Sequence, residues 1–175
     1  MAEMNRNRVL GIAASVLLVA LPITFIIGRP IHFYRIPTVS MSPTLPVNSH
    51  AVIRTTEDVR VGDVIAHRLP SNPKIVLAKR IVAASNDLVE IRDKKLFVNG
   101  RAVDEPYVRY EDPMVYPRRP SLPEPYASRD QFGPYRVPAD SWFVLGDNRD
   151  RSSDSRYWGA VPRDYVIGRL IYVIK

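Results

Sequence analysis

A lysine in the middle of an apolar strand is the first residue of this chain that could do chemistry. Lys79 lies in the run IVLAKRIVAA at 75–84, where strand alternation places it between Leu77 and Ile81 on one face. Burial of an ammonium costs free energy, so such a lysine lowers its pKa, by up to ~3–5 units, and becomes a neutral amine that accepts protons. The alternative is a lysine that reaches solvent along its own aliphatic chain, beside an Arg80 paired with a carboxylate.

Two hydroxyl-rich segments could supply a nucleophile for such a base. The segment at 36–45 reads IPTVSMSPTL, and its prolines predict a rigid, extended, non-helical loop. The segment at 146–159 reads GDNRDRSSDSRYWG and directly follows the apolar run SWFVL. Acids and arginines that alternate on so short a loop favour a structure braced by ion pairs, with a solvated loop as the alternative.

Histidine is a weaker candidate for the base. The chain has His32, His50 and His67 and no cysteine, which excludes a thiol nucleophile, a disulfide scaffold and cysteine-ligated metal sites. A surface or satisfied structural role fits His32 and His67, and His50 is the histidine nearest in sequence to the serines at 36–45. A pair of serine and lysine is therefore the better hypothesis.

Short runs of β-branched residues, bounded by turn formers, must position these groups. Beyond the N-terminal segment no stretch of 10 or more residues keeps a helical period, and 16 prolines against 8 glycines restrict helices further. The soluble part is therefore predicted to be mainly β, with its strongest hairpin turn at Asn99 and Gly100. The candidate strands are 50–54, 63–67, 75–84, 88–92, 95–98, 141–145 and 165–174.

The segment at 106–138 differs from the rest of the chain in composition. It holds eight prolines together with several tyrosines and arginines. Proline removes a hydrogen-bond donor from a sheet and is confined to edges and irregular positions. The composition therefore predicts a long excursion over the β-core that contains no core strand.

The N-terminal segment predicts a membrane anchor. Positions 9–28 read VLGIAASVLLVALPITFIIG, without an ionisable residue, and about 20 such residues cross a ~30 Å hydrocarbon core. Arg6 and Arg8 in the flank at 1–8 and Arg29 beyond the span place cations at both ends, with a slight bias toward a cytoplasmic N-terminus. A cleaved signal peptide and a buried core helix are the alternatives. The net charge of +7 favours anionic partners, and the anchor favours phospholipid head groups over nucleic acid.

Three blocks of the chain together resemble the type I signal peptidases of bacteria, the leader peptidase family of serine proteases with a serine–lysine dyad. They are SMSPTL at 40–45, AKR at 78–80 and GDNRDRSSDSRYWG at 146–159, in the family's order behind one N-terminal anchor. The resemblance implies a mainly β fold, with a signal-peptidase-like antiparallel β-sheet domain at 29–175 preceded by one transmembrane helix.

The resemblance also implies a role for individual residues. Ser40 would be the nucleophile and Lys79 the general base that a serine needs. Ser152 would hydrogen-bond the lysine amine, and Thr38 would complete an oxyanion hole beside the Ser40 amide. The pairs expected to brace the site are Arg80 with Asp147 and Asp154 with Arg156. The residues expected to form the substrate pocket are Ile36, Met41, Leu45, Leu77 and Ala78.

The sequence departs from the family pattern in a few places. Arg151 stands where the family usually has asparagine, and Thr38 replaces a frequent serine but keeps the hydroxyl. Ala78 is smaller than the aliphatic residue that many relatives carry before the lysine. Ala78 therefore implies a wider substrate pocket.

The residues and the resemblance together predict a membrane-bound serine endopeptidase that cleaves signal peptides from exported preproteins. We expect it in the bacterial cytoplasmic membrane, single-pass, with a cytoplasmic N-terminus and an extracytoplasmic catalytic domain. The expected partners are exported preproteins and membrane lipid, not nucleic acid, and no metal or organic cofactor is implied.

Three other functions fit parts of the sequence. One is a serine–lysine peptidase with a dedicated substrate, such as a conjugative pilin. A self-cleaving repressor is disfavoured by the anchor and by the lack of a DNA-binding helix pair. A membrane-tethered β-rich binding module would leave the three matched blocks unexplained.

Overall fold

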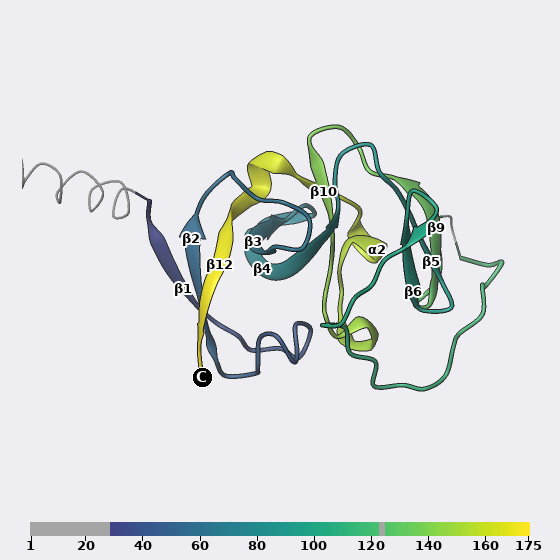
Figure 1. The fold of residues 1–175 in the computed structure, drawn as a ribbon, viewed down its shortest axis with the longest axis horizontal. Coiled ribbons are helices and arrows are strands. Elements are labelled where there is room, and N and C mark those ends of the chain that lie inside the picture. The colour runs from purple at the N-terminus through teal and green to yellow at the C-terminus, as the bar shows by residue number, and fades with distance from the viewer. Residues whose placement is uncertain (1–28, 123–124) are drawn as a thin grey trace, which may run out of the picture. The chain divides into compact units, whose positions relative to one another are not determined.

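The computed structural model describes residues 29–122 and 125–175. The expected flank at 1–8 and the expected anchor at 9–28 lie outside these ranges. Within them, no helix is long and apolar enough to cross a bilayer. The fold that positions the predicted site residues belongs to the unit His32–Lys175 (Figure 1).

A seven-stranded sheet carries the segments that resemble a peptidase. Its strands, in spatial order, are β1 (Ile31–Arg35), β2 (His50–Thr55), β12 (Val166–Ile174), β3 (Val64–Leu69), β4 (Asn72–Ala83), β10 (Ser141–Leu145) and β11 (Val161–Pro162). From β2 to β11 all neighbouring pairs are antiparallel. The strand that carries Lys79, β4, is therefore paired with β3 along one edge and with β10 along the other.

A second, five-stranded antiparallel sheet follows in the middle of the chain. Its order is β7 (Arg101–Ala102), β6 (Lys95–Val98), β5 (Leu88–Arg92), β9 (Gln131–Arg136) and β8 (Tyr126–Ser128). The predicted hairpin joins β6 to β7, and Asn99 and Gly100 both have positive φ, 52° and 78°, as a type I′ turn requires. The short helices are η1 (Arg149–Arg151), α2 (Ser155–Trp158) and η2 (Arg163–Tyr165).

The prediction that 106–138 contains no core strand is wrong for its second half. Residues there form β8 and β9, and Phe132 is 2% exposed in the main apolar cluster. Pro134 is accommodated because the pairing of β9 with β5 shifts register at this point, which frees the ladder position that proline cannot fill. The first half, up to residue 122, runs as irregular chain.

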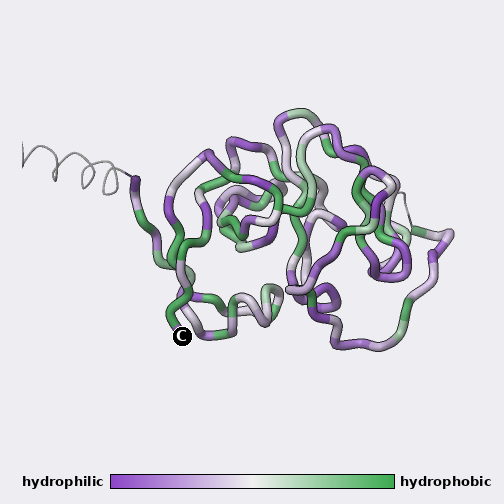
Figure 2. Tube along the Cα trace, viewed as in Figure 1, coloured by the Kyte–Doolittle hydropathy of each residue, from purple (hydrophilic) through white to green (hydrophobic). Residues whose placement is uncertain are grey.

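The strand β10 connects the packing of the two sheets. All five of its residues are buried, which explains the continuous apolar run before the block at 146–159. Phe143 and Leu145 join the cluster that holds Phe132 of β9, whereas Trp142 and Val144 join a cluster with residues of β3 and β4. Figure 2 shows hydrophobic stretches in both sheets. The end of β10 is thus fixed from both faces.

Candidate active site

The structure places Ser40 and Lys79 side by side. Lys79 lies on β4 opposite Ile65 of β3, and its amine donates a 2.8 Å hydrogen bond to Ser40 Oγ. Ser40 comes from the loop at 36–49, between β1 and β2. Lys79 is only 3% exposed. A hydroxyl and an amine therefore meet where the amine is almost free of water.

The loop that carries Ser40 is not extended as predicted. It forms consecutive turns, in which the amide of Leu45 donates to the Met41 carbonyl at 2.8 Å and that of Ser42 donates to the Val39 carbonyl at 3.0 Å. These turns let Met41 and Leu45 enter one apolar cluster, where they are 1% and 0% exposed. Burial of the two side chains sets the path of the loop, because apolar burial outweighs the local preference for extended chain.

Burial also decides the protonation of Lys79. Desolvation lowers the pKa of its amine from 10.5 to about 8. The carboxylates of Asp154 and Asp147 raise this pKa and the Arg156 guanidinium lowers it, but the loss of hydration outweighs the two acids. At a pH of about 8 the Lys79 amine is therefore neutral in about half of the molecules.

Asp147 links β4, which carries Lys79, to the loop that carries Ser40. Arg80 Nε and Nη2 donate to its two carboxylate oxygens at 2.8 and 2.6 Å. Thr44, from the loop at 36–49, donates to the same carboxylate at 2.5 Å. The next amide, that of Asn148, donates to the Ser40 carbonyl at 3.1 Å. The bidentate ion pair therefore holds the backbone of Ser40 in place.

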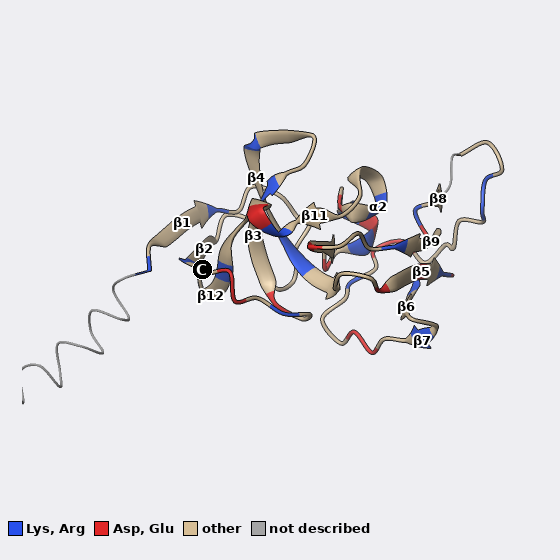
Figure 3. Ribbon diagram, turned by 90° about the horizontal axis from the view of Figure 1, so that it is seen from above, with Lys and Arg blue, Asp and Glu red and all other residues tan. Residues whose placement is uncertain are grey.

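A second bidentate pair lies within the block at 146–159. Arg156 Nε and Nη2 donate to Asp154 at 2.8 and 3.0 Å, and both side chains are buried. Asp154 also accepts the Gly146 amide at 3.1 Å. Burial alone would raise the pKa of Asp154, but Arg156 and these hydrogen bonds hold it below its ordinary value. Figure 3 shows acidic and basic segments close together around α2.

Thr38 and Ser152 differ in how they lie relative to the pair. Thr38 Oγ1 is 3.3 Å from Ser40 Oγ, and Thr38 is exposed. Ser152 is buried, but its hydroxyl has no hydrogen-bond partner among the described residues, so the expected bond to the Lys79 amine is not made. Ser152 packs against Gly146 instead, where an added methyl group would lie 2.2 Å from Ser152 Oγ and 2.5 Å from the Ser40 carbonyl oxygen. Only glycine allows this close approach.

A cavity of about 100 Å³ opens beside the Ser40 hydroxyl. It is small compared with the ~300–1,000 Å³ of a typical ligand pocket. The residues of the expected substrate pocket all line it, together with Ser40 and Lys79: they are Ile36, Met41, Leu45, Leu77 and Ala78. The loop at 36–49 and β4 thus supply most of its lining.

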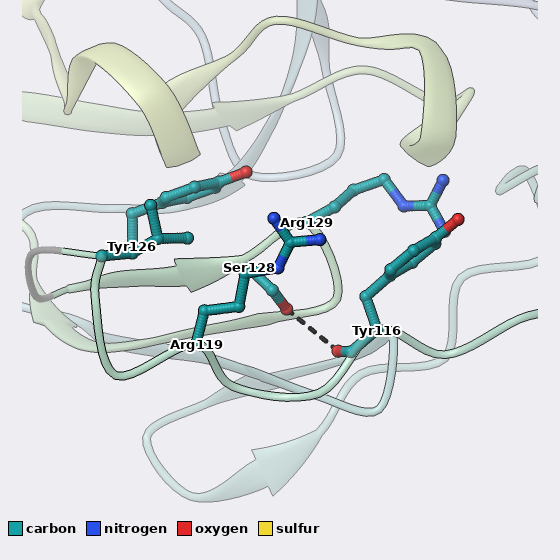
Figure 4. A pocket seen from close by; sticks show the side chains of 6 residues that line it. Tyr116, Arg119, Tyr126, Ser128 and Arg129 are labelled. Carbon is teal, nitrogen blue, oxygen red and sulfur yellow. Dashed lines mark hydrogen bonds between the residues drawn. The ribbon is translucent and has the colours of Figure 1, made fainter.

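A larger cavity, of about 200 Å³, lies beside the second sheet (Figure 4). None of the site residues expected from the sequence lines it. Figure 4 shows the Ser128 hydroxyl, which donates a 3.0 Å hydrogen bond to the Tyr116 carbonyl. The residues that line this cavity are Tyr116, Arg119, Leu122, Tyr126, Ser128 and Arg129.

Several residues that contact the site have no role predicted from the sequence. Thr44, Gly146 and Asn148 stand in the matched blocks, but only the folded chain shows that they contact Asp147, Ser152 or Ser40. His67 is not at the surface: it is fully buried, and its Nδ1 hydrogen-bonds the following carbonyl at 2.8 Å. Burial lowers its pKa to about 4, so its ring stays neutral near Lys79. The continuous apolar run before His67 was the signal that could have predicted this burial, because β3 is buried on both faces from Val64 to His67.

Comparison with known proteins gives consistent matches. Residues 7–174 match a family model described as "Signal peptidase, peptidase S26". Signal peptidase I of Leptolyngbya laminosa is 33% identical over 147 residues, which cover 78% of this chain and 64% of that protein. Probable signal peptidase I-2 of Synechocystis is 33% identical over 143 residues, which cover 77% of this chain and 58% of that protein. A crystal structure of a signal peptidase I from Enterococcus faecalis aligns with 65% of this chain and 97% of that chain, at 30% identity and a TM-score of 0.50.

The fold and these matches define a mainly β peptidase domain of antiparallel sheets. Because the family model spans nearly the whole sequence, the chain belongs to the signal peptidase family, peptidase S26. The family and the mainly β antiparallel fold expected from the sequence are thus confirmed. The matched part spans 64% and 58% of the length of the first two relatives.

The lowered pKa of Lys79 predicts a pH-dependent cost of keeping this side chain. A lysine whose pKa is about 8 when folded and 10.5 when unfolded binds its proton more weakly in the folded chain, so protonation favours unfolding. Lys79→Met should therefore raise the free energy of unfolding near pH 7, by up to about 3 kcal/mol. The gain should shrink as the pH rises from about 8 and should vanish above 10.5. Denaturant unfolding of both proteins at neutral and alkaline pH measures this, and a gain that does not vary with pH would contradict it.

Proposed function

We propose that this chain is a membrane-bound serine endopeptidase that removes signal peptides from exported preproteins. The observation that carries the proposal is the 2.8 Å contact between Ser40 Oγ and the buried Lys79 amine. Family membership supports the same reaction, because the matched relatives are themselves named signal peptidases. In this proposal Ser40 is the nucleophile and Lys79 the general base.

The first half of the reaction is acyl transfer to Ser40. The neutral Lys79 amine accepts the Ser40 proton while Oγ attacks the carbonyl carbon of the scissile bond. The Thr38 hydroxyl and the Ser40 amide donate to the oxygen that becomes negative, and one such donor contributes about 2.7–4 kcal/mol. The tetrahedral intermediate then collapses, and the ammonium of Lys79 gives its proton to the leaving amine. An ester between Ser40 and the signal peptide remains.

The second half returns the enzyme to its starting state. Lys79, neutral again, takes a proton from a water molecule that attacks the ester carbonyl. The ester bond breaks, the signal peptide leaves as a carboxylate, and Ser40 recovers its proton. The Arg80–Asp147 and Asp154–Arg156 pairs act in this cycle as rigid supports, because a serine and a base must stay within hydrogen-bond distance in both halves.

The cavity beside Ser40 supports a preference for small side chains. Its volume of about 100 Å³ suits an alanine, glycine or serine at the cleaved position. An extended substrate would place the side chain two residues earlier on the same side, because side chains alternate along an extended backbone. We propose that Ala78 borders this second position.

The proposal places the reaction at the bacterial cytoplasmic membrane. The apolar run at 9–28 would anchor the chain with its N-terminus in the cytoplasm, and the β-rich domain would act on the other side. An anchor confines enzyme and preprotein to one surface and raises their effective concentration without a new contact. The partners in this proposal are exported preproteins and membrane lipid.

Loss of either reacting group should abolish cleavage. Ser40→Ala and Lys79→Ala should each lower kcat/KM for a preprotein by at least about 10³-fold, and the double variant should be no worse, because the two groups act as one unit. Lys79→Arg should be equally inactive, since a guanidinium stays protonated near neutral pH. Circular dichroism checks that each variant is folded. Activity close to that of the unmodified enzyme in either single variant would disprove the dyad.

Ala78 should set the tolerance at the second substrate position. The unmodified enzyme should accept valine or leucine two residues before the cleaved one, and Ala78→Ile should reject them by about 10–200-fold, because each methylene in a pocket contributes ~1–3 kcal/mol of discrimination. An Ala-x-Ala peptide should be cleaved at a similar rate by both. A peptide series varied only at that position measures this. Identical selectivity of the two enzymes would show that Ala78 does not shape the pocket.

A further inference from the structure

The segment at 105–112 lies against the start of the block at 146–159, which directly follows β10. The Arg109 amide donates to the Asp147 carbonyl at 2.8 Å, and the Arg149 amide donates to the Arg109 carbonyl at 3.1 Å. Arg109 and Asn148 form a parallel bridge outside the regular strands. The start of the proline-rich excursion is therefore attached to the backbone of the residues that hold the nucleophile loop.

A buried ion pair fixes the beginning of this segment. Arg149 donates to both carboxylate oxygens of Glu105, and the two side chains are 3% and 7% exposed. Arg149 Nε also donates to the Gly146 carbonyl at 3.0 Å, and the Tyr107 hydroxyl donates to Glu105 at 3.0 Å. Glu105 thus neutralises a buried arginine and orients Tyr107 at the same time.

The ring of Tyr107 covers Arg80, which forms the ion pair with Asp147. The Arg80 guanidinium carbon lies 3.9 Å from the centre of the Tyr107 ring. The edge of the same guanidinium makes the bidentate contact with Asp147. A cation held against an aromatic face is shielded from water on that side. The side chain of Arg80 is accordingly only 12% exposed.

We propose that Tyr107 is a positioning residue of the peptidase: its ring holds Arg80 on Asp147, and Asp147 in turn fixes the loop that carries Ser40. The inference rests on the proposed function, since it concerns the same serine and lysine. It gives the first part of the excursion at 106–138 a role in catalysis, although no residue of that part contacts Ser40 in the hydrogen bonds described above.

Loss of the Tyr107 ring would also change the electrostatic field at the Lys79 amine. The charged or titratable groups whose fields act on Lys79, or feel its field, are Asp154, Asp147, Arg156 and His67. Without the ring, Arg80 becomes solvated and neutralises Asp147 less completely. The field of Asp147 then favours the ammonium form of Lys79 more strongly, so the acidic limb of the pH–rate profile should move to higher pH.

Three variants of the full-length protein in detergent test the inference. Tyr107→Leu removes the ring, Tyr107→Phe keeps it, and Tyr172→Leu makes the first change at a residue that is 66% exposed on β12. A fluorophosphonate that reacts with Ser40 counts the active sites, so that kcat on a short peptide is expressed per active site. Tyr107→Met serves in place of Tyr107→Leu where the leucine variant does not fold.

We expect Tyr107→Leu to lose at least tenfold in kcat, with KM changed less than twofold and the acidic limb shifted upward by about half a pH unit. Tyr107→Phe and Tyr172→Leu should stay within twofold of the unmodified enzyme at every pH. If the leucine and methionine variants only unfold at lower temperature, with unchanged kcat per active site and an unchanged limb, the ring is a stabilising contact and the inference is overturned. Cleavage by a Ser40→Ala control would instead overturn the proposed function, so the two failures are distinguishable.

Discussion

A lysine amine kept out of water next to a serine hydroxyl is the constraint on which the rest of this structure depends. Lys79 lies where β4 passes from a solvent-exposed start to a buried end, with Ile65 of β3 beside it. Burial there disfavours the ammonium so strongly that two nearby carboxylates do not restore its ordinary pKa. In the proposed mechanism this desolvated amine serves as the base, so no histidine needs to approach Ser40.

Such a site requires the charges around it to be paired and fixed. Asp147 and Asp154 are both fully buried, and each is held by two donors of one guanidinium. An unpaired buried carboxylate would cost several kcal/mol and would also pull a proton onto the lysine. The two pairs therefore stabilise the block at 146–159 and limit how far its acids raise the pKa of Lys79. Gly146 completes the arrangement by letting the Ser40 backbone and Ser152 approach closely.

Much of the scaffold could be predicted because the residue composition of strands and the chemistry of turns are local signals. The strands at 88–92, 95–98 and 141–145 have the predicted bounds, and the turn at Asn99 and Gly100 has the predicted geometry. β9 could not be predicted, because Pro134 marks it locally as broken chain and only the shifted pairing with β5 makes room for it.

Some contacts at the site could likewise be predicted from the sequence and others could not. The apolar run around Lys79 and the matched blocks predicted that Ser40, Lys79, Arg80 and Asp147 would gather, and the structure brings them together. The contact of Tyr107 with Arg80 depends on the path of an irregular segment. No hydrophobic periodicity in the sequence predicts that path. The hydrogen bond expected from Ser152 depends on the rotation of one side chain, which spacing along the chain does not determine.

The most direct test of this account is a titration of the Lys79 amine itself. Lysine side chains labelled with ¹³C at Cε can be followed by NMR in the full-length protein in detergent, with Lys79→Met to assign the signal. We expect an apparent pKa of about 8 for the Lys79 amine. A titration of Lys79 near 10.5 would contradict this expectation, because the amine would then be protonated near neutral pH and could not act as the proposed base.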